Sequence, residues 1–163
     1  MIYFQDTTYE SVIDIEHPNY AYLAGHKIDN KVLMPATGLI CGVWNQLGDM
    51  FGRDWDRCPV QLQNVVLTRT TILNPGVKST LVYKINSKSG MFTVENQDGI
   101  VVTGKIQQLL EKPEEIGLRA VKENSSVLVL TKEDVYKELS LRGCGHVGAF
   151  QRIESMDSKG IWT

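Results

Sequence analysis

Of the three histidines in the sequence, His26 stands where an imidazole could act as a base. An apolar run that begins at Pro35 follows it, and the residue before this proline, Met34, has no side-chain oxygen that could cap a helix. The first backbone N–H groups of such a helix, around Thr37 and Gly38, are therefore expected to be free to bind an anion or a polarised carbonyl. An imidazole beside such a helix start offers a base for an acidic C–H bond, and the N–H groups offer donors to an enolate oxygen. From residue types alone, a loop histidine without a role is the alternative interpretation.

Other residues that could carry chemistry give weaker patterns. His17, beside Pro18, is expected on the surface. Cys144 and His146 are two positions apart, but no second pair of ligands accompanies them, so no metal site is expected. Cys41 lies inside the apolar run and is expected to fill the core. The sequence contains neither a Gly-x-Ser-x-Gly elbow nor a P-loop.

The composition is that of a soluble globular protein, with 42% apolar and 22% charged residues in 163. A net charge of −2 gives no reason to expect a nucleic-acid or membrane partner. The first residues carry no basic segment or cleavage signal, so secretion is not expected. Three widely spaced cysteines fit reduced thiols, and we expect a cytoplasmic location.

The segment from Pro35 to about Phe51 predicts one helix, with the proline in its first turn and Gly52 at its end. Apolar residues cover most of its circumference, so the helix is expected to be buried and wrapped by other elements. The residues expected to be almost inaccessible are Val43, Trp44 and Leu47.

The rest of the first 110 residues predicts a sheet. Residues 1–25 read as irregular or short-strand structure, and strands are expected at 60–73, 80–85, 91–95 and 100–110, with an Asp-Gly turn before the last. One buried helix followed by an antiparallel meander is an α+β pattern, in which the sheet curls around a central helix.

The composition changes after residue 110. Residues 111–130 are charged and interrupted by proline, and we interpret them as a linker between a first domain, 1–110, and an incomplete second domain, 131–163. A short helix is expected to start at Thr131, its N-cap, and to end near Ser140, before a glycine-rich loop.

Two blocks of sequence resemble a known family. The spacing His26-x-x-x-Asn30-x-x-x-x-Pro35 is similar to the His-x-x-x-Gly-x-x-x-x-Pro motif of dehydratases in fatty acid and polyketide synthases. Its continuation, Pro-Ala-Thr-Gly at 35–38 and then Val-Trp at 43–44, resembles the animal-type fatty acid synthase, such as that of an insect or other invertebrate. Residues 135–143 and 150–153 resemble the start of that family's second half.

The resemblance implies a double hot-dog fold, with residues 1–110 as the first hot-dog and a truncated second one. It implies that a 3-hydroxyacyl group, held as a thioester on acyl carrier protein phosphopantetheine, loses water to give the trans-2-enoyl product during fatty acid biosynthesis. His26 matches the catalytic base, and Pro35, Thr37 and Gly38 match a substrate-binding segment. No metal or cofactor is expected in this segment. The implied partners are the acyl carrier protein domain and the rest of the synthase chain, which is expected to form a homodimer.

Two departures from the family pattern matter. Asn30 replaces the motif glycine, although asparagine tolerates a positive φ, and residues 146–148 replace a Tyr-Gly-Pro stretch. The family's catalytic aspartate lies in the second half and is expected just past Thr163. Asp157 stands too early, in an expected turn, and is not assigned, so the isolated segment is expected to be inactive.

Two alternatives stay open at this point. One is a catalytically inactive hot-dog module that binds acyl chains or serves in dimerisation. The other, a stand-alone hot-dog thioesterase, is disfavoured because a single hot-dog needs no segment such as residues 131–163.

Overall fold

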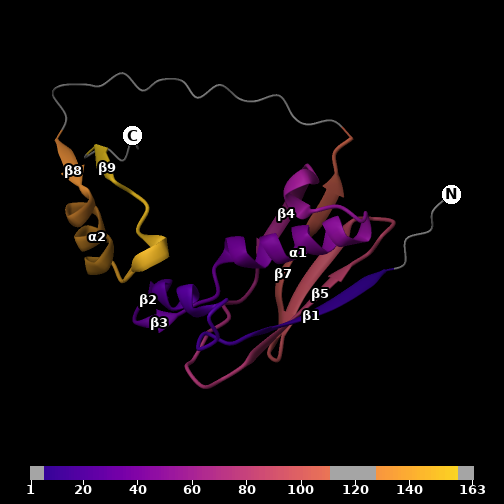
Figure 1. Cartoon of the computed structure of the whole chain (residues 1–163), viewed down its shortest axis with the longest axis horizontal. Coiled ribbons are helices and arrows are strands. Elements are labelled where there is room, and N and C mark those ends of the chain that lie inside the picture. Colours follow the sequence, from indigo (N-terminus) through magenta and orange to yellow (C-terminus); the bar gives the residue numbers. More distant parts are fainter. Residues whose placement is uncertain (1–5, 111–127, 158–163) are drawn as a thin grey trace.

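The computed structural model describes residues 6–110 and 128–157. One five-stranded antiparallel sheet dominates the first part of the chain, and helix α1 (Ala36–Met50) lies across it (Figure 1). The strands follow one another across the sheet in the order β1 (Thr7–Ile13), β5 (Ser79–Ile85), β6 (Met91–Asn96), β7 (Gly99–Gln108) and β4 (Val60–Leu67). The predicted helix and antiparallel meander are thus confirmed.

The strands end where turn chemistry replaces β-branched residues. Between β5 and β6 the Asn86 side chain accepts a hydrogen bond from the Ser89 backbone N–H at 2.9 Å, and β6 meets β7 in a tight turn closed by Gly99 at φ 110°. Strand β4 is shorter than the predicted 60–73, because the chain bulges at Asn64 (φ 50°) and leaves the sheet after Leu67.

Strand β1 is longer than the short-strand structure expected near the start of the chain. It pairs with β5 along all seven of its residues. Because it lies at an edge of the sheet, most of its side chains are exposed or half-buried, and the hydrophobic alternation that marks a strand in sequence is missing.

Helix α1 has the predicted extent, with Pro35 as its N-cap and Gly52 beyond its end at φ 61°. Val43 and Leu47 are 0% and 4% exposed, as predicted. The expectation for Trp44 is wrong: it is only half-buried, and its Nε1–H donates to the Cys58 carbonyl at 2.7 Å.

Cys41, expected in the core, is exposed. The reason is the helical repeat: the sheet packs against one side of α1, and every fourth residue on the other side is uncovered within the described part of the chain. This exposed stripe consists of Thr37, Cys41, Asn45 and Asp49.

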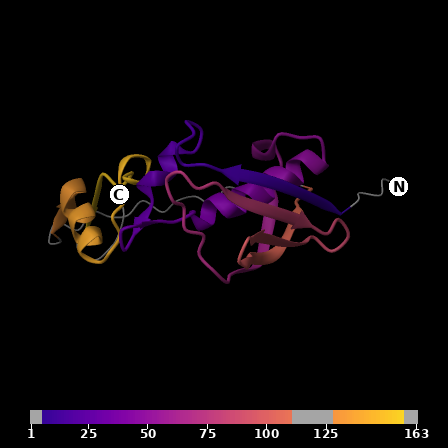
Figure 2. The same ribbon diagram turned by 90° about the horizontal axis from the view of Figure 1, so that it is seen from below.

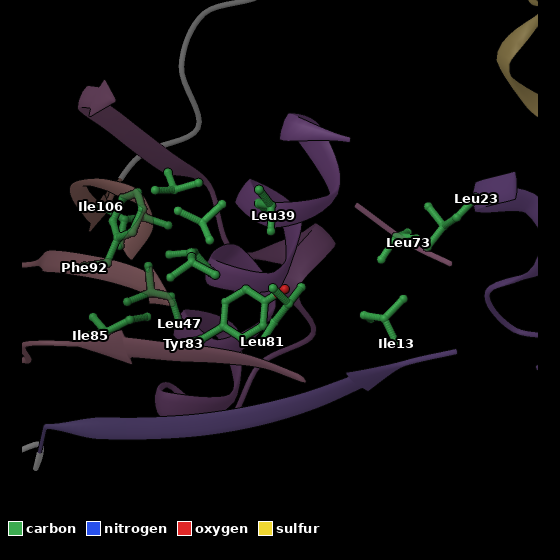
Figure 3. Close-up of a cluster of buried hydrophobic side chains, with 14 of the residues drawn as sticks. Ile13, Leu23, Leu39, Leu47, Leu73, Leu81, Tyr83, Ile85, Phe92 and Ile106 are labelled. Atoms are coloured by element: carbon green, nitrogen blue, oxygen red, sulfur yellow. The ribbon is translucent and has the colours of Figure 1, made fainter. Parts of the chain in front are cut away.

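The hydrophobic core fills the space between α1 and the sheet (Figure 3). Strands β5, β6 and β7 contribute large side chains that meet Leu39 and Leu47 of the helix. A second group, Ile13, Leu23 and Leu73, extends the core beyond the first turn of α1 and so supports the loops around the candidate base.

Residues 128–157 form a small unit of helix α2 (Lys132–Leu141) on the paired strands β8 (Val129–Thr131) and β9 (Ser155–Asp157). The predicted helix is confirmed, and Thr131 caps it in a capping box with Asp134. Two expectations are wrong: residues 129–130, assigned to the linker, begin β8, and Asp157, assigned to a turn, pairs in β9. Residues 111–127 of the predicted linker lie outside the described residues.

This small unit packs against a two-stranded hairpin of β2 (Lys27–Ile28) and β3 (Lys31–Val32), next to the N-terminal end of α1 (Figure 2). Ile28 forms a β-bridge with Cys144, and the Asp29 N–H donates to the Gly143 carbonyl at 2.8 Å. Within the described residues, no helix has the length and apolarity needed to cross a membrane.

Candidate active site around His26

His26 lies between the short 3-10 helix η1 (Ala21–Gly25) and the β2–β3 hairpin. The hairpin turns at Asp29 and Asn30, whose φ angles are 48° and 61°, the left-handed pair that two-residue hairpin turns require. The expectation that Asn30 adopts a positive φ in place of the motif glycine is confirmed. The turn brings Leu33 back beside His26, and the Leu33 N–H donates to the His26 carbonyl at 3.1 Å.

The same pairing fixes the histidine ring. His26 Nδ1 lies 2.9 Å from the Leu33 carbonyl oxygen. A carbonyl oxygen can only accept, so Nδ1 must carry the proton, and the lone pair of the neutral imidazole lies on Nε2. Nε2 makes no hydrogen bond to the described residues, which leaves it available as a base.

Two rings from the later part of the chain contact the His26 ring. His146 stacks on it with a centroid distance of 5.0 Å and an interplanar angle of 16°. Phe150, in the 3-10 helix η3 (Gly148–Phe150), lies at 5.1 Å and 52°, and it also stacks on Tyr22. We call His146 and Phe150 the aromatic clamp.

Gly25 permits the clamp to approach. A Cβ atom on this residue would collide with the Val147 carbonyl oxygen, so a larger residue would push the two segments apart. In turn, the Val147 N–H donates to the Gly25 carbonyl at 2.9 Å, which pins the loop between α2 and η3 to the residue before His26.

The start of α1 lies two residues beyond the carbonyl that holds His26. Pro35 occupies the N-cap position, and no side chain caps this end of the helix. The first N–H bonded back to it is that of Leu39, at 3.2 Å from the Pro35 carbonyl oxygen. The uncapped helix start predicted from the sequence is confirmed.

A mostly apolar pocket of about 350 Å³ opens at this helix start. The three residues predicted to bind substrate, Pro35, Thr37 and Gly38, all line it, together with Tyr83 and Phe150. His26 is not part of the lining, but its ring neighbour Phe150 is. The structure therefore brings the predicted residues into one neighbourhood, while their roles stay predictions. A larger hollow of about 610 Å³, lined by charged side chains, lies at the opposite end of α1.

Burial shapes the electrostatics of the site. It lowers the pKa of the His146 imidazole, and the nearby His26 lowers it further when charged, so His146 favours its neutral form. The His146 Nδ1 is buried without a hydrogen-bond partner among the described residues, a situation that costs about 1–3 kcal/mol. Burial likewise raises the pKa of the Tyr83 hydroxyl well above its usual range, so this group is a neutral phenol beside the pocket.

Among the other candidates, His146 belongs to the aromatic clamp and Cys41 lines the apolar pocket, whereas the ring of His17 contacts Tyr20. His17 is exposed, as predicted, and its Nδ1 accepts from the Asn19 N–H at 3.3 Å. Among the described residues, no group of three side chains is placed to hold a metal ion. Sequence reasoning missed the contacts of His146 and Phe150 with His26, because only folding brings these residues together. The available signals were the resemblance at 150–153 and the departure from the family pattern at 146–148.

The structure has the hot-dog fold, and it resembles solved dehydratase domains. The dehydratase domain of the CurF module of curacin polyketide synthase superposes with a TM-score of 0.77 at 19% identity, over 93% of this chain and 56% of that one. An inactive mutant of the CurK dehydratase, with a histidine replaced by phenylalanine, superposes with a TM-score of 0.71 at 21% identity, over 93% of this chain and 54% of that one. The predicted fold is confirmed, and the chain spans about half the length of such double hot-dog domains.

A sequence relative lies among the polyketide synthases. The chain is 30% identical over 162 residues to probable polyketide synthase 17 of Dictyostelium discoideum, a match that covers 92% of this chain and 6% of that protein. No known protein-family profile matches the chain.

Proposed function

We propose that the chain is the first half of a dehydratase domain that eliminates water from a 3-hydroxyacyl thioester. The observation that carries this proposal is the hydrogen bond of 2.9 Å between His26 Nδ1 and the Leu33 carbonyl, on a hot-dog fold. In the neutral form of the ring, this bond places the lone pair on Nε2, and an uncapped helix start follows two residues after Leu33, which is the arrangement that an α-proton abstraction needs.

In the proposed reaction, Nε2 of His26 takes a proton from C2 of the substrate. The electrons of the broken C2–H bond form the C2=C3 double bond, and the C3–O bond breaks. The departing hydroxyl gains a proton and leaves as water, and the product is the trans-2-enoyl thioester.

The start of α1 contributes to the same step. Abstraction of the C2 proton places negative charge on the thioester oxygen, and backbone N–H groups near Thr37 and Gly38 can donate to it, aided by the positive end of the helix dipole. The apolar pocket beside them is suited to the first carbons of the acyl chain.

The acid that protonates the leaving hydroxyl is assigned to none of the described residues. Asp157 lies in β9, where it pairs with Val129 of β8. The family resemblance places this acid, an aspartate, in the second hot-dog, and one CurK mutant with aspartate replaced by asparagine is inactive. We assign the acid to that second half.

The substrate is proposed to arrive on an acyl carrier protein of the same multifunctional synthase. The solved neighbours support a dehydratase from the wider group of fatty acid and polyketide synthases. Within that group we propose a cytoplasmic, animal-type fatty acid synthase, on the Pro-Ala-Thr-Gly block that follows His26.

The test is His26→Ala in the full synthase, with loss of a 3-hydroxyacyl thioester as the readout. We expect the dehydration rate to fall by roughly 10²- to 10⁴-fold, the usual worth of a general base, while the preceding reduction of the 3-oxoacyl group to the 3-hydroxyacyl group continues. His17→Ala is the matched control, because it removes an exposed imidazole whose ring contact is with Tyr20 and not with His26. Full dehydration by His26→Ala would overturn the proposal and favour the inactive acyl-binding module.

A further inference from the structure

The aromatic clamp gives His146 a role that the proposed reaction does not yet include. One hydrogen bond through Nδ1 leaves the His26 ring free to tilt about the line from Nδ1 to the Leu33 oxygen. The outer torsion of a histidine side chain has a broad energy minimum, so it does not prevent this tilt. A flat ring stacked on one face does prevent it.

We propose that His146 is a positioning residue, whose imidazole stacks on His26 and, with Phe150, holds Nε2 in the orientation that accepts the substrate proton. This inference rests on the proposed function of His26. It adds His146, from residues 128–157, to the site that residues of the first hot-dog form.

The backbone around His146 is fixed in a way that suits this role. Gln151 Nε2–H donates to the His146 carbonyl at 2.8 Å, and the next residue, Val147, donates its N–H to Gly25 at 2.9 Å. Tyr136 of α2 donates its hydroxyl hydrogen to the Phe150 carbonyl at 3.2 Å. The two members of the aromatic clamp are thus held by separate hydrogen bonds.

The His146 nitrogens argue against a purely structural histidine. A histidine retained for the core would be expected to use its ring nitrogens in hydrogen bonds, yet the buried Nδ1 has no partner among the described residues. The ring itself makes the contacts, to His26 at 5.0 Å and to Phe150 at 6.2 Å.

The chemistry of the reaction agrees with a neutral ring at this place. Once His26 takes the C2 proton it becomes an imidazolium, which aromatic faces stabilise and a second positive charge would oppose. Burial favours the uncharged form of His146, so the stacked ring accepts the new charge without repulsion.

The experiment compares His146→Ala, His146→Phe and His17→Ala in the full synthase. Alanine removes the stacked ring, and we expect kcat for dehydration to fall roughly 10- to 100-fold with KM nearly unchanged, the size of effect that a small misplacement produces. Phenylalanine keeps a flat ring, so it should restore kcat to within about threefold of the original value. His17→Ala should leave both parameters unchanged.

A spectroscopic readout tests the positioning directly. In the chain labelled with ¹⁵N-histidine, the ring nitrogens of His26 should show one fixed tautomer, with the proton on Nδ1. His146→Ala should move these shifts toward the average of two tautomers, whereas His146→Phe should not, and His17 serves as the internal reference.

The outcomes separate the two claims. If His26→Ala abolishes dehydration while His146→Ala leaves kcat unchanged, the positioning role is wrong and the proposed function stands. Circular dichroism will show whether His146→Phe is folded. If it is folded but its kcat for dehydration is as low as that of His146→Ala, the reaction depends on a ring nitrogen of His146 and not on its flat ring, and the stacking role is overturned. If His26→Ala is fully active, the proposed function itself fails. Should His146→Ala not fold, the phenylalanine variant alone decides.

Discussion

Burial lowers the pKa of His146, and the effect of this change on the free energy of unfolding can be measured by varying the pH. Its pKa is lowered in the folded state, so at acidic pH the unfolded chain binds more protons at this residue than the folded chain does. The stability contributed by the neutral ring is therefore complete above the ordinary histidine pKa of about 6.5 and declines as the pH falls below it.

We expect His146→Phe to remove this decline. Urea unfolding midpoints measured at several pH values between 5 and 8 should show the original chain losing stability toward pH 5 relative to the phenylalanine variant. The variant also removes the unpartnered Nδ1, so it should be no less stable at pH 8. Parallel pH profiles for the two proteins would contradict the lowered pKa.

Asn30 offers a second prediction at the level of a single residue. At φ 61° it occupies the left-handed region, which costs a β-branched residue roughly 1–2 kcal/mol. Asn30→Val should lower the free energy of unfolding by about that amount, and Asn30→Gly, which restores the family's residue, should not lower it. Equal stability of the two variants in urea would show that the turn has relaxed.

Local sequence features indicated part of the candidate site. Residue types suggested His26 and the uncapped start of α1, and the family resemblance strengthened His26 and drew attention to Asn30. These features are local, because turn preference and helix capping depend on neighbouring residues. The aromatic clamp could not be foreseen in this way, since His146 and Phe150 reach His26 only through tertiary packing.

Helix α1 contains a contact that can be tested without reference to the site. A Cβ atom on Gly42 would collide with the buried ring of Tyr83, which is 3% exposed. We expect Gly42→Ala to lower the free energy of unfolding by about 1–3 kcal/mol, as overpacking does.

Two variants check the cause of this loss. Gly38→Ala is the control in the same helix, because its nearest obstacle is the flexible end of the Met34 side chain, at 2.9 Å. Tyr83→Leu should reduce the cost of Gly42→Ala in a double-mutant cycle, since it removes the ring. Additive effects of the two substitutions would mean that the ring is not the obstacle.

The capping box of α2 gives a prediction for the small unit. The Thr131 side chain accepts from the Asp134 N–H at 3.3 Å, and the Asp134 side chain accepts from the Thr131 N–H at 3.1 Å. Thr131→Ala should cost about 1 kcal/mol of stability, whereas Thr131→Ser, which keeps the hydroxyl, should cost much less. Amide exchange along α2 measures the difference, and equal protection in both variants would contradict it.

The contrast between local sequence features and tertiary packing also explains which helices and strands could be predicted. The limits of α1, α2 and the β5–β7 meander follow from proline, glycine and capping residues, and they were predicted closely. The exposure of Cys41 and the edge strand β1 were missed, because both depend on which side of an element another element covers.

At the scale of the whole molecule, the sheet has two edges within the described residues, β1 and β4. Both carry exposed apolar side chains: Tyr9 and Val12 on β1 are 51% and 48% exposed, and Val66 and Leu67 on β4 are each 52% exposed. An unprotected edge of this kind pairs with another chain.

We therefore expect the isolated chain to self-associate, as a dimer or as larger species. Light scattering at tens of micromolar (roughly) should detect this, and Val66→Lys should weaken it if β4 is the edge involved, because a charge at an edge strand opposes pairing. A stable monomer for the original chain would show that these edges are protected.

The hydrogen bond between Val147 and Gly25 joins two parts of the chain that leave the ribosome at different times during protein synthesis. The sheet and α1 are complete once β7, ending at Gln108, has left the ribosome, but the rings of His146 and Phe150 that contact His26 emerge 38 and 42 residues later. At typical translation rates this is a delay of roughly 2–8 s. For that interval a nascent chain carries a folded hot-dog sheet in which the His26 ring is bonded to the Leu33 carbonyl but is not yet contacted by the aromatic clamp.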